Sequence, residues 1–127
     1  MADYIDTVTE GHTETARLGV HELVRRLNSH LGPTLVAALA NVRDRKLPSK
    51  WAQAEGPELR SESWSRLQMA HRVWTLISDA ESDHVARAWF IGANPRLGEV
   101  SPVLKLREGA LSEVMSAARA FVEGTDD

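Results

Sequence analysis

The sequence predicts an all-α fold, and three observations carry that prediction. Apolar residues recur about every 3.6 positions in the longer segments, as they do on the buried face of an amphipathic helix. Proline and glycine fall between these segments, where helices begin and end. No segment alternates apolar and polar residues like a half-buried strand. With 127 residues, 43% of them hydrophobic, the chain suits one compact domain or two small helical pieces that share a core.

The first expected helix begins at Thr13 and ends before Gly32, which is the residue type that commonly follows a helix. Pro33 then opens a second helix over residues 33–40, since proline lacks only an N–H group that the first turn leaves unbonded anyway. This helix is short and nearly all apolar, so we expect it to be buried on most sides. Residues 1–12 are polar, and we expect a flexible N-terminus there.

A third short helix is expected from Trp51 to Ala54, closed by Gly56. A longer helix follows over residues 61–78, with Ser61 as its N-cap. Its apolar residues lie mostly three positions apart: Trp64, Leu67, Ala70, Val73, Trp74 and Ile77.

Three more helices are expected after residue 80. Ser82 or Asp83 caps the first, which runs to Gly92. Ser101 caps the second, with Pro102 in its first turn and Gly109 as its end. The last is amphipathic, with Leu111, Val114, Met115, Ala118, Phe121 and Val122 on its apolar face. The chain therefore divides into the flexible N-terminus, a helical region over 13–79, a three-helix region over 80–123 and an acidic tail over 124–127.

No arrangement of residues in the sequence indicates catalysis or metal binding. There is no cysteine, and no two of the five histidines are three or four residues apart, as a metal site on one helix requires. Glu99 stands where a phosphate-binding loop needs a lysine. We therefore expect a protein that is not an enzyme and that has no cofactor and no metal.

The composition also restricts partners and location. The formal net charge of −3 and the pI near 5.9 exclude a general polyanion binder, so any nucleic-acid contact must come from a local patch. The chain has no secretory signal and no apolar run of the roughly 20 residues that span a bilayer. A cytoplasmic protein is expected.

Residues 41–50, the basic segment, form such a patch, with Asp44 as their one acid. A helix, a short turn and a second short helix in this region resemble a helix-turn-helix layout, with Ala37 at the helix contact and Asn41 in the turn. Pro48 falls inside the presumed recognition helix, so that helix either begins only there or is broken. A solvated loop is the alternative. The candidate contacts to DNA are Arg43, Arg45, Lys46 and Lys50.

Residues 92–101, the corner segment, concentrate the residue types that interrupt helices. Such a turn loses little entropy when a partner docks on it. Around it we expect an exposed apolar patch with Arg96 and Glu99 at the rim. The alternative is a tight corner between helices, with two aromatics in the core. The expected patch is formed by Phe90, Leu97, Val100 and Val103.

This region resembles the toxin-binding domain of the Xre/MbcA/ParS antitoxins. That domain has an aromatic-rich helix ending in Trp, an Asn-Pro step, a Leu-Gly pair, a Pro, a short helix ending in Gly and a final amphipathic helix. The resemblance covers residues 80–123 and is looser over residues 33–80, which would be a degenerate helix-turn-helix. The matching residues are Trp89, Asn94, Pro95, Leu97, Gly98, Pro102, Leu106, Gly109 and Val114.

The resemblance implies an antitoxin of a type II toxin–antitoxin pair that binds and inhibits a RES-domain, NAD-consuming toxin. Some family members also bind their own promoter. A homodimer or a toxin–antitoxin hetero-oligomer would follow. The length before Pro33 and the presence of Pro48 depart from the family pattern and weigh most against promoter binding. The toxin-binding residues would be Trp89, Phe90, Asn94, Pro95, Arg96, Leu97, Gly98 and Pro102.

Two other functions stay open at this point. One is a stand-alone DNA-binding transcription regulator that uses the basic segment. The other is an adaptor whose C-terminal region mainly self-associates.

Overall fold

The computed structural model describes residues 19–124, and over this range the protein is all-α, as predicted. One isolated antiparallel bridge, between Asn94 and Val100, is the only β pairing among these residues. The elements are α2 (Gly19–Leu31), α3 (Pro33–Ala40), α4 (Leu47–Trp51), α5 (Ser61–Ala80), α6 (Asp83–Ile91), the 3-10 helix η1 (Pro95–Leu97), α7 (Pro102–Arg107) and α8 (Leu111–Glu123).

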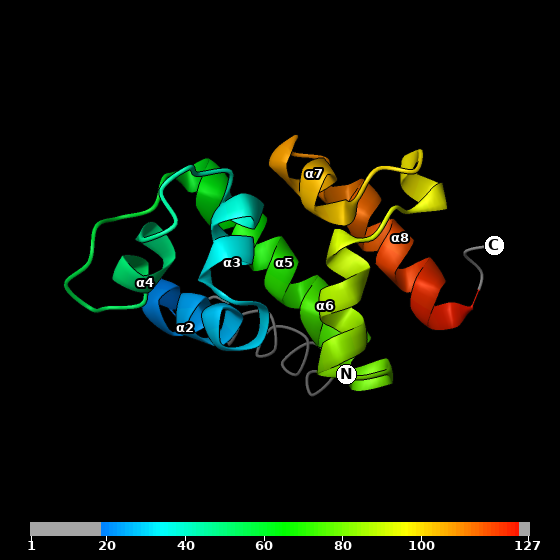
Figure 1. Ribbon diagram of the computed structural model, residues 1–127, viewed down its shortest axis with the longest axis horizontal. Helices are drawn as coiled ribbons and strands as arrows, with labels where there is room; N and C mark the ends of the chain where they lie inside the picture. The colour runs from blue at the N-terminus through cyan, green and yellow to red at the C-terminus, as the bar shows by residue number, and fades with distance from the viewer. Residues whose placement is uncertain (1–18, 125–127) are drawn as a thin grey trace, which may run out of the picture.

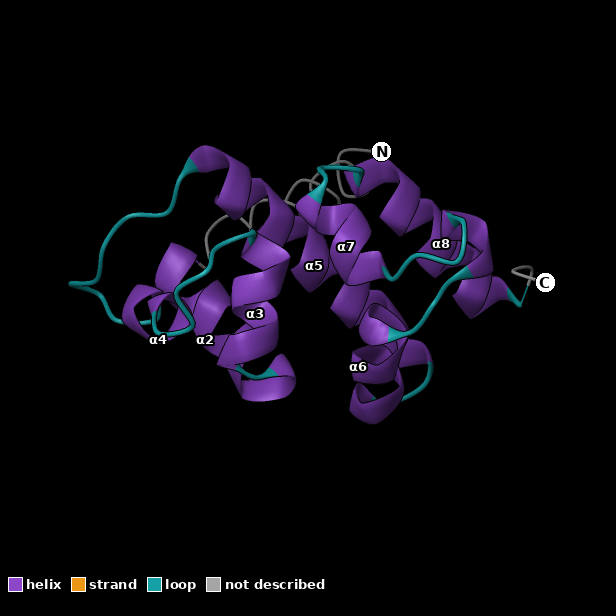
Figure 2. Cartoon of the chain, turned by 45° about the horizontal axis from the view of Figure 1, so that its top comes forward, coloured by secondary structure: helices purple, strands orange, loops and turns teal. Residues whose placement is uncertain are grey.

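Helix α5, the longest element, runs through the middle of the molecule (Figure 1). Helices α2, α3 and α4 gather on one side of it, and α6, α7 and α8 on the other. The connection from α4 to α5 projects from the end of the first group (Figure 2). The basic segment and the corner segment therefore lie in different halves, which are joined by α5 and by direct packing of α3 on α7.

A single hydrophobic core extends through both halves. Leu67, Val73 and Ile77 of α5 are fully buried within it, because residues three or four apart fall on one helix face. Leu27 of α2 and Val114 of α8 belong to the same cluster, although they come from opposite halves. The predicted regions 13–79 and 80–123 thus share one core.

Most helix ends follow from local sequence signals. Ser82 caps α6 by accepting a hydrogen bond from the Val85 N–H at 3.1 Å, and Ser101 caps α7 by accepting one from the Leu104 N–H at 3.3 Å. The expectation that Ser61 would cap α5 is wrong. Arg60 is the N-cap, without a side-chain cap bond, and Ser61 is the first helical residue.

The expected helix from Trp51 to Ala54 is also wrong. Helix α4 begins at Leu47 and ends at Trp51, so Pro48 lies in its first turn, where its missing N–H breaks no helical bond. The chain turns instead after α4, and the Gly56 N–H donates to the Gln53 carbonyl at 2.9 Å.

Several predictions fall outside the described residues. They are the flexibility expected of residues 1–12, the expected start of the first helix at Thr13, and the expected acidic tail at residues 125–127. Across residues 19–124, no helix combines the length and the apolar character that a bilayer crossing requires.

Candidate functional site

The corner segment is built around the backbone and side chain of Asn94. The Asn94 carbonyl accepts hydrogen bonds from the N–H groups of Leu97, at 2.9 Å, and Glu99, at 2.8 Å. Its side-chain Oδ1 accepts from the Arg96 N–H at 2.9 Å, and its own N–H donates to the Val100 carbonyl at 3.2 Å. One buried residue thus closes the loop on itself, and the buried Leu97 anchors the loop in the core.

Two consecutive residues at the tip of this loop have left-handed backbone angles. Gly98 has φ 68° and Glu99 has φ 66°. Glycine adopts this region freely, whereas a residue with a Cβ is disfavoured by about 1–2 kcal/mol. Backbone strain of this kind tends to occur at functional sites, so Glu99 marks the tip as a candidate contact.

The structure divides the eight predicted toxin-binding residues into two groups. Pro95, Arg96 and Gly98 are exposed on the outside of the corner. The other five are buried and support the corner from inside: Trp89, Phe90, Asn94, Leu97 and Pro102. The ring of Trp89 lies edge-on to Phe90, with centroids 5.7 Å apart, and 6.4 Å from Phe121 of α8. The interpretation of the two aromatics as core is confirmed.

The prediction of which residues form an exposed apolar patch around the corner is wrong. Phe90 is 0% exposed, Leu97 4% and Val103 8%, so these side chains point into the core. Two large hydrophobic side chains are strongly exposed instead, Ile91 at 54% and Leu104 at 47%. One ends α6 just before the corner and the other lies on α7 just after it.

The helical period of the sequence is enough to predict that both residues are exposed. On α6, Ala86 and Phe90 are four residues apart and share the buried face, so Ile91 falls about 100° away from it. On α7, Val103 and Leu106 share the buried face, and Leu104 falls outside it. The periodicity predicts these exposed positions once it is applied residue by residue.

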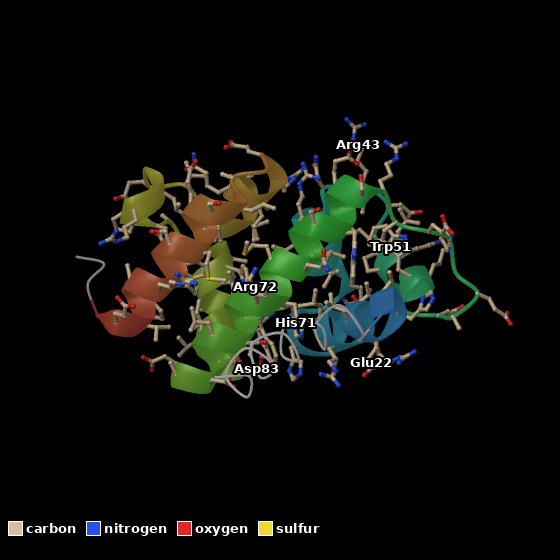
Figure 3. All side chains as sticks on the ribbon, turned by 180° about the vertical axis from the view of Figure 1, so that it is seen from behind. Glu22, Arg43, Trp51, His71, Arg72 and Asp83 are labelled. Atoms are coloured by element: carbon tan, nitrogen blue, oxygen red, sulfur yellow. The ribbon has the colours of Figure 1, made fainter. Side chains whose placement is uncertain are left out.

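The basic segment follows α3 through a left-handed turn at Asn41, whose φ is 62°. The Asn41 N–H donates to the Ala38 carbonyl and the Val42 N–H to the Ala37 carbonyl, which is the bonding of a Schellman cap. The expected turn conformation of Asn41 is confirmed. All four candidate DNA contacts are exposed: Arg43, Arg45, Lys46 and Lys50. In Figure 3, Arg43 points away from the molecule beside the start of α5.

Three side chains of α2 hold the short helix α4 in place. His21 Nδ1 lies 2.8 Å from the Trp51 carbonyl, Arg25 donates to the Ala52 carbonyl at 2.9 Å, and Asn28 donates to the Pro48 carbonyl at 2.9 Å. Residues 21, 25 and 28 share one face of α2, because they are four and three residues apart. A five-residue helix is too short to be stable alone, so these bonds and the buried Trp51 determine where α4 lies.

Helix α4 does not resemble a recognition helix in its dimensions. Five residues span only about 7.5 Å, and Pro48 and Trp51 face the interior. Ser49 and Lys50 are its exposed residues. The cations of this region therefore lie mainly on the loop before α4, a placement that suits phosphate contacts better than base contacts.

A cluster of polar and aromatic side chains joins α2, α5 and α6. Oδ1 of Asp83 accepts a hydrogen bond from Trp74 Nε1 at 2.7 Å. Oδ2 of Asp83 is hydrogen-bonded to His30 Nδ1 at 3.0 Å. The His30 ring packs on Trp74 with centroids 4.2 Å apart. The hydrogen bond with His30 lowers the pKa of Asp83 most. Burial opposes this shift, and the hydrogen bond from Trp74 and the charge of His30 lower the pKa further.

His71 lies in the same region and is only 8% exposed (Figure 3). Burial lowers its pKa, because the charged imidazolium loses hydration. The charges of Arg26 and His30 lower this pKa further. No group of three or more His, Cys, Asp or Glu side chains in the described part of the chain is arranged to hold a metal ion.

Comparison with known proteins gives no match among family models, curated proteins or solved structures.

Proposed function

We propose that this protein is the antitoxin of a type II toxin–antitoxin pair and that it inhibits a RES-domain, NAD-consuming toxin through the corner segment. It acts by binding, with no catalytic step of its own. The proposal begins from the sequence resemblance over residues 80–123.

One structural observation supports it most. The two strongly exposed large hydrophobic side chains in the described part of the chain, Ile91 and Leu104, come just before and just after the corner. Exposed apolar side chains beside polar ones are typical of protein–protein contact sites. The exposed Arg96 and Glu99 lie between these two residues in the sequence. Since the corner is already closed by its own hydrogen bonds, binding would not need to order it.

The test is co-expression with the product of the adjacent gene, which the proposal requires to be a RES-domain protein, with growth and co-purification as readouts. We expect Ile91→Asp together with Leu104→Asp to abolish co-purification and protection, because each buries a charge in the interface. Thr34→Asp is the matched control, since Thr34 is exposed on α3 in the other half. The proposal fails if the double variant, folded as judged by circular dichroism, protects as well as the control, or if the unmodified chain captures no such protein.

DNA binding by the basic segment is the second candidate function. The exposure of Arg43, Arg45, Lys46 and Lys50 supports it, because phosphate contacts need cations that solvent can reach. The brevity of α4 weighs against the reading of bases by a recognition helix.

A further inference from the structure

The basic segment continues, in three dimensions, onto residues far away in the sequence. Arg107, at the end of α7, donates from Nε to Asn41 Oδ1 at 3.2 Å, across 66 residues of chain. Its neighbour Leu106 accepts a hydrogen bond from Arg66 Nε of α5 at 2.9 Å. The end of α7 therefore lies beside the start of the basic segment and beside α5.

A surface pocket of about 460 Å³ lies within this region. Its lining includes Asn41 and Leu47 from the basic segment together with Arg60 and Arg66 from the start of α5. Arg60 and Arg66 line the pocket, and Arg107 is joined to Asn41. Together with the exposed cations of the loop before α4 they make up what we call the cationic surface: Arg43, Arg45, Lys46, Arg60, Arg66 and Arg107.

The acids nearby determine where an anion can bind. Glu58 and Glu62 line the pocket, so a phosphate inside it would meet two carboxylates. Asp44 accepts a hydrogen bond from the Lys46 N–H at 2.8 Å, which occupies one of its oxygens within its own turn. Glu108, next to Arg107, pairs with Lys105 at 3.6 Å. The six cations of the surface outnumber Asp44, Glu58, Glu62 and Glu108, so an extended chain of phosphates along the loop and the helix ends fits better than one small anion in the pocket.

We propose that this cationic surface binds the phosphate backbone of duplex DNA, with Arg107 and Arg60 as contacts, and that it does not read bases. The proposal deepens the second candidate function and rests on it. A five-residue α4 offers no helix to lay along a major groove. The surface presents no exposed aromatic ring for single-stranded bases to stack on, because Trp51 is 3% exposed and Trp64 is half-buried.

The experiment measures binding of the full chain to a short labelled DNA duplex by fluorescence anisotropy, from about 50 mM salt upward. We expect Arg107→Gln to reduce the slope of log K against log salt by about 0.9, as the loss of one phosphate contact does. Arg60→Gln should act similarly, and Arg107→Lys should keep the slope. Arg119→Gln is the control, since Arg119 is exposed on α8 in the other half. Circular dichroism establishes that each variant folds.

Each result that would contradict the inference overturns a different part of it. No binding at about 50 mM salt overturns both the second candidate function and this inference. Binding in which Arg107→Gln and Arg60→Gln both behave like Arg119→Gln overturns the inference and leaves the candidate function standing. Tighter binding of the matching single strand overturns the choice of duplex. Affinity for the chain's own upstream DNA on the order of 100-fold above a shuffled duplex would show base reading and overturn the phosphate-only mode.

Discussion

The basic segment and the corner segment both connect helices, and both have an asparagine at a critical point, yet they are held in opposite ways. Asn41 is exposed and left-handed, and α4 after it is fixed by side chains of α2. Asn94 is buried and extended, and its four hydrogen bonds all stay within residues 94–100. The first region is fixed by side-chain hydrogen bonds from a distant helix, whereas the second is closed by local hydrogen bonds and anchored in the core by Leu97.

The basic segment and the corner segment also differ in charge. The basic segment has four cations and one acid, while the corner has one of each, Arg96 and Glu99. A cationic surface attracts an extended anion over a distance, and its exact shape matters little. An apolar contact needs its side chains already in position. Under the two proposed functions, the self-closed loop is found at the site where shape matters more.

The glycines provide the strongest test of this comparison. A Cβ on Gly56 would come 1.8 Å from the Lys50 carbonyl oxygen and 2.7 Å from its carbon, so the backbone after α4 must move. A Cβ on Gly98 meets nothing within 4 Å and faces only the disfavoured φ of 68°. We expect Gly56→Ala to lower the free energy of unfolding by about 3 kcal/mol and Gly98→Ala by about 1 kcal/mol.

Urea unfolding of both variants measures this difference. Equal losses of stability would contradict the view that one glycine is needed for close packing and the other only for its backbone angle.

Acid provides a second test, because protonation of the buried His71 on α5 should destabilise the whole fold. The pKa of His71 is lowered in the folded protein by burial and by Arg26 and His30, so the unfolded chain binds its proton more readily. The free energy of unfolding should therefore be highest above the ordinary histidine pKa of about 6.5. Below that pH it should fall by up to about 1.4 kcal/mol per pH unit because of His71.

Thermal unfolding between about pH 7 and pH 5.5, on either side of that pKa, measures the effect. His71→Gln should flatten the dependence, whereas His84→Gln, at an exposed position of α6, should leave it unchanged. A slope that persists in His71→Gln would exclude His71 as its source.

The smallest expected effect concerns Glu99. Replacement by glycine relieves the left-handed strain but increases the freedom of the unfolded chain, so we expect a gain of about 0.5 kcal/mol. Asn41→Gly should bring no such gain, because asparagine tolerates the same angles and its side chain accepts a hydrogen bond from Arg107. Denaturant midpoints of the two variants decide this, and a loss of stability in Glu99→Gly would show that its side chain makes a compensating contact.

Local signals in the sequence predicted the carboxyl-terminal half well. Ser82 and Ser101 each bond to a backbone group three residues later, so nothing distant alters their role. The bounds of α4 were missed because His21, Arg25 and Asn28, at least 20 residues earlier, supply bonds that no local pattern reveals. The cationic surface was only partly visible, since Arg107 joins it through a contact across 66 residues.

The exposed side chains beside the corner were not predicted, for a different reason. Residue type alone favours the aromatics Trp89 and Phe90 as contact residues, although the helical period puts them inside and Ile91 outside. For interface prediction on a short helix, the orientation of each position is more informative than how hydrophobic it is.

The core shared across α5 has a consequence for the whole chain. Because neither half has a core of its own, both should melt together in one cooperative transition. A partner that occupies only the corner then adds its binding free energy to the folding of every helix, including α4 at the far end. Degradation of the unbound chain would therefore remove both surfaces at once, and a bound partner would protect both.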